Sequence, residues 1–531
     1  MRLVPLLFIA LLLFGCSAGP DFTRPKAEVS SSWLEEGDPR LKTTAADYRN
    51  WWKAFNDPVL DRLIDRAYRE NLSLRIAGVR VLEARAQLGI VIGRLYPQAQ
   101  QAFGSLQYNR TSEDAPQAAV LPVGKGAVSP SSNPLLSYWQ SQIGLSASWE
   151  IDFWGKFRRA IESADASFLA TIADYDSALV SLTADVTNSY ILIRTLEKRL
   201  GIARRNVDVQ KESLRIAEDR FQFGKASQLD VEQAKTVLND TLASIPALET
   251  QLRQAKNGLS VLLGLPPNDL VEALEGSSEI PVSPPEIVVG IPNDLLRRRP
   301  DVRSAEYRAA AQSAQIGVAK ADLYPAFSLT GMFGFLSSDA GHFALSDMFA
   351  WKSRVLQAGP SVQWNIFNYG RITNNVRAQD ARLEQLLIAY QNVVLKAQQE
   401  VEDALVAFLR AQERLQFLAR STAAAKTSLD LALLQYREGL KDFTTVLLAQ
   451  QILLNEQDSL TITLGSISSN LVAVYRALGG GWEMREGEEW VPSAVKEEMG
   501  NRTNWGKLLA PASDDQPLSG ERKSPVRFPD W

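Results

Sequence analysis

The chain of 531 residues contains one cysteine and one histidine, and both scarcities restrict its chemistry. With His342 alone it cannot build a histidine-based metal site or a Ser-His-Asp triad. With Cys16 alone it cannot form an internal disulfide or a cysteine cluster. The net charge of −4 leaves no basic footprint, and we interpret the arginine run 297–299 before Pro300 as a solvated segment ahead of a helix. We therefore expect no enzyme, no metal, no resident cofactor and no nucleic-acid partner.

The amino terminus has the charge and length of a secretion signal. A basic residue precedes an apolar run of about 13 residues, which is too short to span a bilayer. The stretch 13–16 (Leu-Phe-Gly-Cys) resembles a bacterial lipobox, which implies cleavage before Cys16 and a covalent lipid on it; the alternative is a buried free cysteine in an ordinary helix. Ser17 in place of aspartate implies sorting to the outer membrane. Residues 1–15 are thus a predicted signal peptide, and 16–57 a lipid-anchored N-terminal linker.

An internal duplication organises most of the chain. Residues 149–156 (Trp-Glu-Ile-Asp-Phe-Trp-Gly-Lys) align with residues 364–371 (Trp-Asn-Ile-Phe-Asn-Tyr-Gly-Arg) at an offset of 215, and this register continues to Leu263 and Leu478. Each copy has the same expected order: helix, two strands, a very long helix and a return helix. Tandem copies of one unit predict two similar halves of a single structure.

The long helices are predicted by the spacing of their apolar positions. Thirteen positions recur at a mean of 3.5 residues from Leu179 to Phe221, and the same positions recur from Val394 to Tyr436. A sustained 3.5-residue repeat is typical of a coiled-coil seam. Each long helix would measure roughly 100 Å at 1.5 Å per residue. Breaks at Gly224 and Gly439 predict the tips of two helical hairpins.

The predicted strands alternate in polarity. From Ile143 to Phe153 every odd position is apolar and every even position is small or polar. Alternation over about ten residues is what a strand of a transmembrane barrel requires, with one face toward lipid; the alternative is a half-buried soluble sheet. Four strands cannot close a barrel with an aqueous lumen, because about eight is the lower limit, whereas three copies supply twelve.

These patterns divide the chain into repeats. The first repeat, 58–264, has a helix, strands at about 98–110 and 139–153, a long helix over 156–223 and a return helix over 229–263. A linker over 265–293 leads to the second repeat, 294–482, with a helix, strands at about 326–336 and 355–367, a long helix over 371–438 and a return helix over 444–478. Residues 483–531 lack periodicity, and we expect a poorly ordered tail.

Several ordered motifs now resemble one family. They are residues 51–60 (Trp-Trp-Lys-Ala-Phe-Asn-Asp-Pro-Val-Leu), 295–306 (Leu-Leu-Arg-Arg-Arg-Pro-Asp-Val-Arg-Ser-Ala-Glu), 436–439 (Tyr-Arg-Glu-Gly) and 477–482 (Ala-Leu-Gly-Gly-Gly-Trp). With the duplication and the lipobox, they resemble the TolC-like outer membrane efflux protein family in its NodT-type lipoprotein branch. The resemblance implies an α+β membrane protein: a homotrimer with a twelve-stranded barrel in outer-membrane lipid, continued by an α-helical coiled-coil tunnel across the periplasm. It also implies two protein partners, a periplasmic adaptor and an inner-membrane pump, commonly of the resistance–nodulation–division type.

The resemblance further implies a gate at the tip of the second repeat. The family tends to place an aspartate there that forms a constricting ring in the trimer. This chain has Leu448 at that position and Thr444 at the preceding apolar position, with Asp442 close by. We therefore expect a periplasmic gate around Asp442, Thr444 and Leu448 that is more apolar than acidic. The alternative is that Leu447 and Leu448 simply pack between helices.

Three classes of function compete. The first is a passive exit duct of a tripartite efflux system, and within this class a type I secretion channel or a metal-efflux channel is the alternative. The second is a lipid-anchored coiled-coil structural protein without a pore, which would not need alternating strands. The third is an enzyme, and no P-loop, zinc motif or triad supports it. A duct selects little, so the sequence leaves the cargo open.

Overall fold

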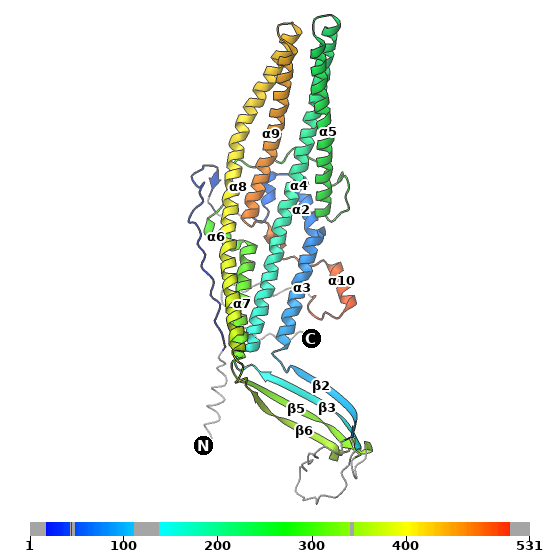
Figure 1. Ribbon diagram of the computed structural model, residues 1–531, viewed down its shortest axis with the longest axis vertical. Helices are drawn as coiled ribbons and strands as arrows, with labels where there is room; N and C mark the ends of the chain where they lie inside the picture. The colour runs from blue at the N-terminus through cyan, green and yellow to red at the C-terminus, as the bar shows by residue number, and fades with distance from the viewer. Residues whose placement is uncertain (1–16, 43, 45–47, 111–136, 340–344, 510–531) are drawn as a thin grey trace, which may run out of the picture.

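The computed structural model describes residues 17–42, 44, 48–110, 137–339 and 345–509. Figure 1 shows an elongated chain, with two helical tips at one end and a four-stranded sheet at the other. The predicted signal peptide, Cys16 and His342 lie outside the described residues. Within these ranges, no helix is both long and apolar enough to cross a membrane.

Two helices of 67 residues form the frame of the structure: α4 (Lys156–Gln222) and α8 (Arg371–Arg437). At about 1.5 Å per residue, each is roughly 100 Å long. Both begin directly after a glycine in the left-handed conformation, Gly155 at φ +76° and Gly370 at φ +81°. Many of the apolar positions that recur every 3.5 residues are buried against neighbouring helices. Examples are Leu179 on α4 and Val401 on α8.

Shorter helices cover the two long ones. From the tips, α5 (Gln228–Leu262) returns along α4, and α9 (Phe443–Ala477) returns along α8 and also packs on α4. Toward the sheet, α7 (Pro300–Ala321) lies against both α4 and α8, and α3 (Leu72–Gly93) lies against α4 (Figure 1). Helices α2 (Pro58–Glu70) and α6 (Pro292–Arg298) precede α3 and α7.

Two capping residues set where the first short helices begin. The carboxylate of Asp57 accepts a hydrogen bond from the Val59 N–H at 2.8 Å, which caps α2, and another from the Tyr190 hydroxyl of α4 at 2.8 Å. The helix expected from residue 58 is interrupted at Asn71, whose side chain accepts from the Leu74 N–H at 2.8 Å and starts α3. Capping side chains satisfy N–H groups that have no partner within the helix.

The sheet is antiparallel, in the order β2 (Ala99–Arg110), β3 (Ser137–Ile151), β5 (Ala326–Ser338) and β6 (Arg354–Gln363). The central pair joins the two repeats, with Leu145 opposite Phe333. One side of β2 and one side of β6 have no strand partner within the described chain. A single chain therefore leaves two long edges of unpaired backbone groups.

One face of this sheet exposes its apolar side chains. On β3 the exposed apolar residues all occupy odd positions, as the alternation predicts: Trp139, Ile143, Leu145, Trp149 and Ile151. Their neighbours on β5 and β6 continue the same face: Leu329, Phe333, Leu356 and Val362. An apolar patch of this extent marks a surface that contacts lipid or protein instead of water.

The middle of the body holds the largest core. Strand β1 (Leu41–Lys42) pairs in parallel with β4 (Ile287–Val288), which ties the N-terminal segment to the linker between the repeats. Beside them the 3₁₀ helix η1 (Trp51–Phe55) buries its aromatic side chains, and Trp51 stacks on Tyr475 of α9 with ring centroids 5.2 Å apart. Aromatic side chains bury large areas, which explains why the first expected motif begins with tryptophans.

The expectation of a poorly ordered tail is wrong for residues 483–509. A 3₁₀ helix, η4 (Trp482–Arg485), packs on α4, and α10 (Ser493–Arg502) lies beside α3 (Figure 1). Val491 and Met499 are buried with Leu82 of α3 in a small cluster. A few isolated side chains hold the segment against the body. Isolated contacts leave no periodic pattern in the sequence, so its order could not be predicted. Residues 510–531 lie outside the described residues.

A buried ion pair is the strongest of these anchors. The carboxylate of Asp176, on α4, is fully buried and accepts from the Arg485 guanidinium, with Nη2 to Oδ2 at 3.0 Å. The guanidinium of Arg303, on α7, lies 3.8 Å from the same carboxylate and 5.1 Å from the ring centroid of Trp482. Three distant parts of the sequence thus meet at one carboxylate.

Arg485→Met should release the C-terminal segment from the body. Removing one partner of a buried pair typically costs about 3–5 kcal/mol, because the remaining charge stays desolvated. We expect faster proteolytic cleavage within residues 483–509 of the folded protein. Arg49→Met is the matched control, since its ion pair with Glu486 is exposed and such pairs contribute about 0–1 kcal/mol. Equal cleavage rates in the two variants would contradict this assignment.

Candidate functional site

The two hairpin tips, defined here as the turns at Gly224 and Gly439, have the same geometry. Both glycines adopt the left-handed conformation, with φ of +63° and +78°. The Lys225 N–H donates to the Arg220 carbonyl at 2.7 Å, and the Leu440 N–H donates to the Gln435 carbonyl at 2.9 Å. This pattern ends a helix with a left-handed residue, a conformation that glycine adopts without the steric cost of a Cβ.

The helices that leave the tips begin differently. Ser227 caps α5: its hydroxyl accepts from the Asp230 N–H at 3.3 Å and donates to the Asp230 carboxylate at 2.9 Å. Asp230 thus lies in the first turn of a helix, where a negative charge is favourable. Asp442 occupies the capping position of α9 without a capping hydrogen bond from its side chain, and it is exposed.

The tips share a small apolar core of their own. It includes Ala217 of α4, Val231 of α5, Tyr436 of α8 and Phe443 of α9. Burial raises the pKa of the Tyr436 hydroxyl above its ordinary value. The ring of Tyr436 packs edge-on against Phe443, with centroids 5.2 Å apart. Side chains from both hairpins therefore stabilise one another at the end farthest from the sheet.

Arg220 of α4 connects the first hairpin to the second. Its guanidinium donates to the backbone carbonyl of Tyr436 and, at 3.0 Å, to that of Arg437, and its central carbon lies 4.6 Å from the Tyr436 ring centroid. The last carbonyls of a helix have no partners within it and lie at the negative end of its dipole. Arg220 therefore caps the end of α8 from the neighbouring hairpin.

Further polar contacts join the same two hairpins below the tips. The Gln450 amide of α9 donates to the Ser213 hydroxyl of α4 at 2.6 Å in a buried position. The Arg199 guanidinium of α4 donates to the Asp458 carboxylate of α9 at 2.6 and 3.0 Å. The contacts of Arg220, Ser213 and Gln450 could not be predicted from the sequence, because no local pattern indicates which helix each residue will contact.

The three predicted gate residues all lie at the tip of the second repeat. Thr444 and Leu448 are exposed and lie one turn apart on the same face of α9, with Asp442 just before the helix. Leu448 is 58% exposed, whereas the neighbouring Leu447 packs against the tip core. Within one chain, Leu448 therefore does not have the packing role that was its alternative interpretation. Its role in a constriction remains a prediction.

The junction between sheet and helices is the second notable region. The Trp149 indole donates to the Leu95 carbonyl at 3.1 Å, and the Trp364 indole donates to the Leu323 carbonyl at 3.0 Å. These residues correspond to one another in the sequence alignment of the two repeats. Trp154 stacks on Tyr324 beside them, with centroids 4.5 Å apart. Three tryptophan side chains thus lie where the sheet meets the helices.

The first described residues after Cys16 lie at this junction. The Ala18 N–H donates to the Trp154 carbonyl at 2.9 Å, and Arg159 of α4 contacts the Asp21 carboxylate at 2.5 Å. From there the N-terminal segment, residues 17–42, runs along the helical body away from the sheet (Figure 1). The predicted lipid attachment site is therefore adjacent in sequence to residues that lie at the base of the sheet.

Arg220→Met should loosen the contact between the two tips. The substitution removes the donors that cap α8, and charge-assisted hydrogen bonds of this kind contribute about 1.5–3 kcal/mol. We expect at least tenfold faster amide hydrogen exchange in the last turn of α8. Arg204→Met provides the control, because Arg204 lies on the same helix and its exposed ion pair is with Glu249 of α5, away from the end of α8. Identical exchange in both variants would show that Arg220 does not hold the tip.

Comparison with known proteins identifies relatives along most of the chain. The sequence profile of the family described as "Outer membrane efflux protein" matches residues 63–265 and 291–480. Nodulation protein T of Rhizobium leguminosarum is 31% identical over 89% of this chain and 92% of its own. The pyoverdine export outer membrane protein OpmQ of Pseudomonas aeruginosa is 32% identical over 91% of this chain and 98% of its own. The solved structure of the outer-membrane channel OprN, 31% identical, superposes with a TM-score of 0.79 over 88% of this chain and 100% of that one.

Proposed function

This chain belongs to the outer membrane efflux protein family, and we propose that it is the outer-membrane exit duct of a tripartite efflux system. In this proposal it conducts substrates passively from a periplasmic adaptor and an inner-membrane pump, of the resistance–nodulation–division type, to the exterior. Since a passive duct selects little, the pump determines the cargo. The observation that carries the proposal is the incomplete sheet, with its exposed apolar face and two free edges.

The free edges favour closure by further copies of the same chain. Unpaired backbone N–H and C=O groups are too costly in lipid, so a sheet that enters a membrane must close on itself. Strand β6 runs toward the helices and β2 runs away from them, so that β6 of one copy meets β2 of the next in antiparallel orientation. Three copies then give a twelve-stranded barrel, wide enough for an aqueous lumen.

The positions of aromatic side chains support a barrel in outer-membrane lipid. Trp149 and Trp364 lie at the helical end of the sheet, and Tyr108 and Trp139 pair at the other end with ring centroids 5.2 Å apart. Aromatic residues are enriched at both interfaces of transmembrane barrels. A lipid on Cys16 fits the same arrangement, because residues 18–21 lie at the helical end of the sheet.

The helical body forms the periplasmic tunnel in this proposal. Along α8, several large apolar residues remain exposed in the single chain: Ile388, Leu395, Val406, Phe417 and Leu431. Their separations of 7, 11, 11 and 14 residues all approximate whole turns of a helix, so they lie near one face. A neighbouring copy would cover this face. The tips would then meet the adaptor, about 100 Å from the sheet.

Other functions are less well supported. A coiled-coil structural protein without a pore would not require a sheet that exposes Leu145, Phe333 and Leu356 on one face. A type I secretion channel or a metal-efflux channel would share the same duct architecture, and it stays the alternative within the class. We propose no catalytic role and no cofactor beyond the lipid on Cys16.

The first prediction from this proposal concerns assembly. Because one chain cannot satisfy both sheet edges, the protein should require detergent and should contain three copies. Multi-angle light scattering, corrected for bound detergent, measures the number of chains directly. A stable monomer without detergent, with unchanged helix content by circular dichroism, would exclude the barrel.

The second prediction concerns the resting gate. In a trimer each residue of the constriction occurs three times, and a ring of leucines excludes water by dewetting, whereas a ring of carboxylates attracts cations. Leu448→Ser should therefore raise the single-channel conductance in planar bilayers. Asp442→Ala should change cation selectivity with less effect on closure. If Leu448→Ser leaves conductance unchanged and Asp442→Ala opens the pore, the constriction is acidic.

A further inference from the structure

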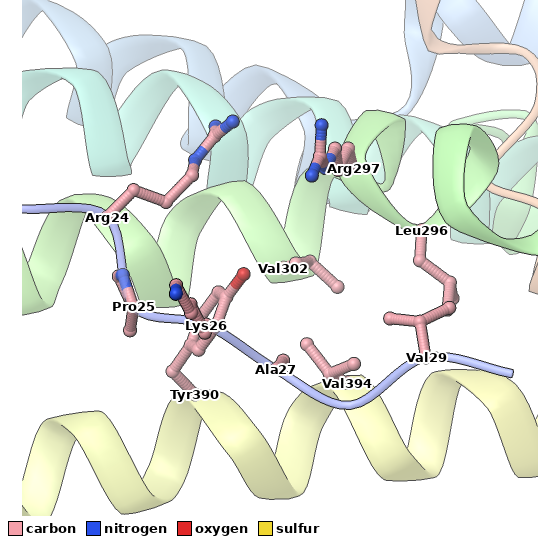
Figure 2. Close-up of a pocket in the computed structure, with 10 residues that line it drawn as sticks. All are labelled: Arg24, Pro25, Lys26, Ala27, Val29, Leu296, Arg297, Val302, Tyr390 and Val394. Atoms are coloured by element: carbon pink, nitrogen blue, oxygen red, sulfur yellow. The ribbon is translucent and has the colours of Figure 1, made fainter.

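A cavity lies under the N-terminal segment, far from both the sheet and the tips. Residues 24–29 run lengthwise between α7 and α8 (Figure 2). The cavity that they border has a volume of about 360 Å³. Tyr390 of α8 borders the cavity 19 residues after the helix begins, which places it roughly 30 Å from the sheet end and roughly 70 Å from the tip. This position is beyond the reach of a lipid held in the bilayer.

The cavity has a mixed lining, and one wall of it is apolar. Leu296, Val302 and Val394 are buried beneath it, and Ala27 and Val29 face them from the N-terminal segment (Figure 2). Small-molecule sites are usually apolar clefts of about 300–1,000 Å³ with a few polar groups. The volume corresponds to about twelve waters at ~30 Å³ each, which is enough for a molecule with one or two rings.

Three cationic side chains line the same cavity. Arg24 is held by Glu306 of α7, with two contacts of 2.8 Å. Lys26 and Arg297 also line it, and among the described residues the structure records no ion pair for either. They belong to different segments, the N-terminal segment and α6. An anion bound in the cavity would therefore interact with two cations for which the described residues supply no ion-pair partner.

Tyr390 adds a hydrogen-bond donor at the cavity wall. A tyrosine hydroxyl is protonated at neutral pH at its ordinary pKa, and burial raises the pKa of Tyr390 further. A protonated phenol and two cations favour a carboxylate or sulfonate over an amine or a neutral molecule. The apolar wall favours a ligand with a hydrocarbon body over a simple inorganic anion.

We propose that this cavity binds a small anionic amphiphile, an aromatic or aliphatic carboxylate or sulfonate with a body of one or two rings in size. The anionic group lies between Lys26 and Arg297, and the hydrocarbon body lies against Leu296, Val302 and Val394. A bound ligand links the N-terminal segment to α6 and α8, so it strengthens the hold of that segment on the helical body. The proposal does not depend on passage of substrates through the protein.

The test uses 1-naphthoate as the probe and the full-length protein in lipid nanodiscs, which avoids competition from detergent. Isothermal titration calorimetry should detect saturable binding of 1-naphthoate, and at least tenfold weaker binding of neutral 1-naphthalenemethanol. The double variant Lys26→Gln/Arg297→Gln should weaken naphthoate binding at least tenfold. Arg298→Gln is the matched control, because Arg298 is exposed on the same helix but does not line the cavity. It should change the affinity less than twofold.

A second variant tests the location without changing charge. Val29→Trp fills the space from the N-terminal segment, which is not part of the helical core, and it should abolish binding while the chain retains its helix content. The conductance of these variants in planar bilayers should equal that of the unmodified protein, which separates this proposal from the proposed duct function. Absence of naphthoate binding at millimolar concentration, or binding that neither the double variant nor Val29→Trp reduces, overturns the proposal.

Discussion

The structure depends on one constraint: two helices of about 100 Å must bury an apolar seam along their whole length. Neither α4 nor α8 can bury it alone: α3, α5, α7 and α9 pack on α4, and α7 and α9 pack on α8. The hairpin tips, the capping residues and the N-terminal segment all contribute contacts that hold the shorter helices against the long ones. One chain leaves the apolar face of the sheet and one face of α8 exposed, and these are the surfaces that further copies would cover in the proposed trimer.

The sequence allowed the periodic parts of this fold to be predicted, and the family predicted from its motifs is confirmed. The 3.5-residue spacing and the two glycine breaks indicate the long helices, because they are local properties of the chain. The contacts of Arg220 with Tyr436 and of Asp176 with Arg485 could not be predicted. Each joins residues more than 200 positions apart, so it depends on how the hairpins pack.

The charged residues show the same limit. The arginine run 297–299 was expected to be solvated, yet Arg299 is buried and donates to the Ala477 carbonyl and to Asp301 and Glu400, whereas Arg297 is exposed at the edge of a cavity. Within the N-terminal segment, the Arg40 guanidinium lowers the pKa of Asp38 to about 2. A sequence pattern can indicate that a charged residue lies on a helix. Only the packed structure shows whether its side chain is buried in an ion pair, as Arg299 is, or exposed, as Arg297 is.

In the proposed trimer, the tip of the second repeat would combine two ways of holding a narrow passage closed. A carboxylate ring would place three like charges close together, and their repulsion would work against closure unless cations bound there. Leu448 avoids that repulsion, and its exposure leaves the side chain available to a neighbouring copy. Arg220 acts within one chain, where it neutralises the negative end of α8 and joins the first hairpin to the second. In the proposed trimer, closure would therefore be stabilised by apolar contact between copies and by a cation inside each copy, and opening would have to overcome both.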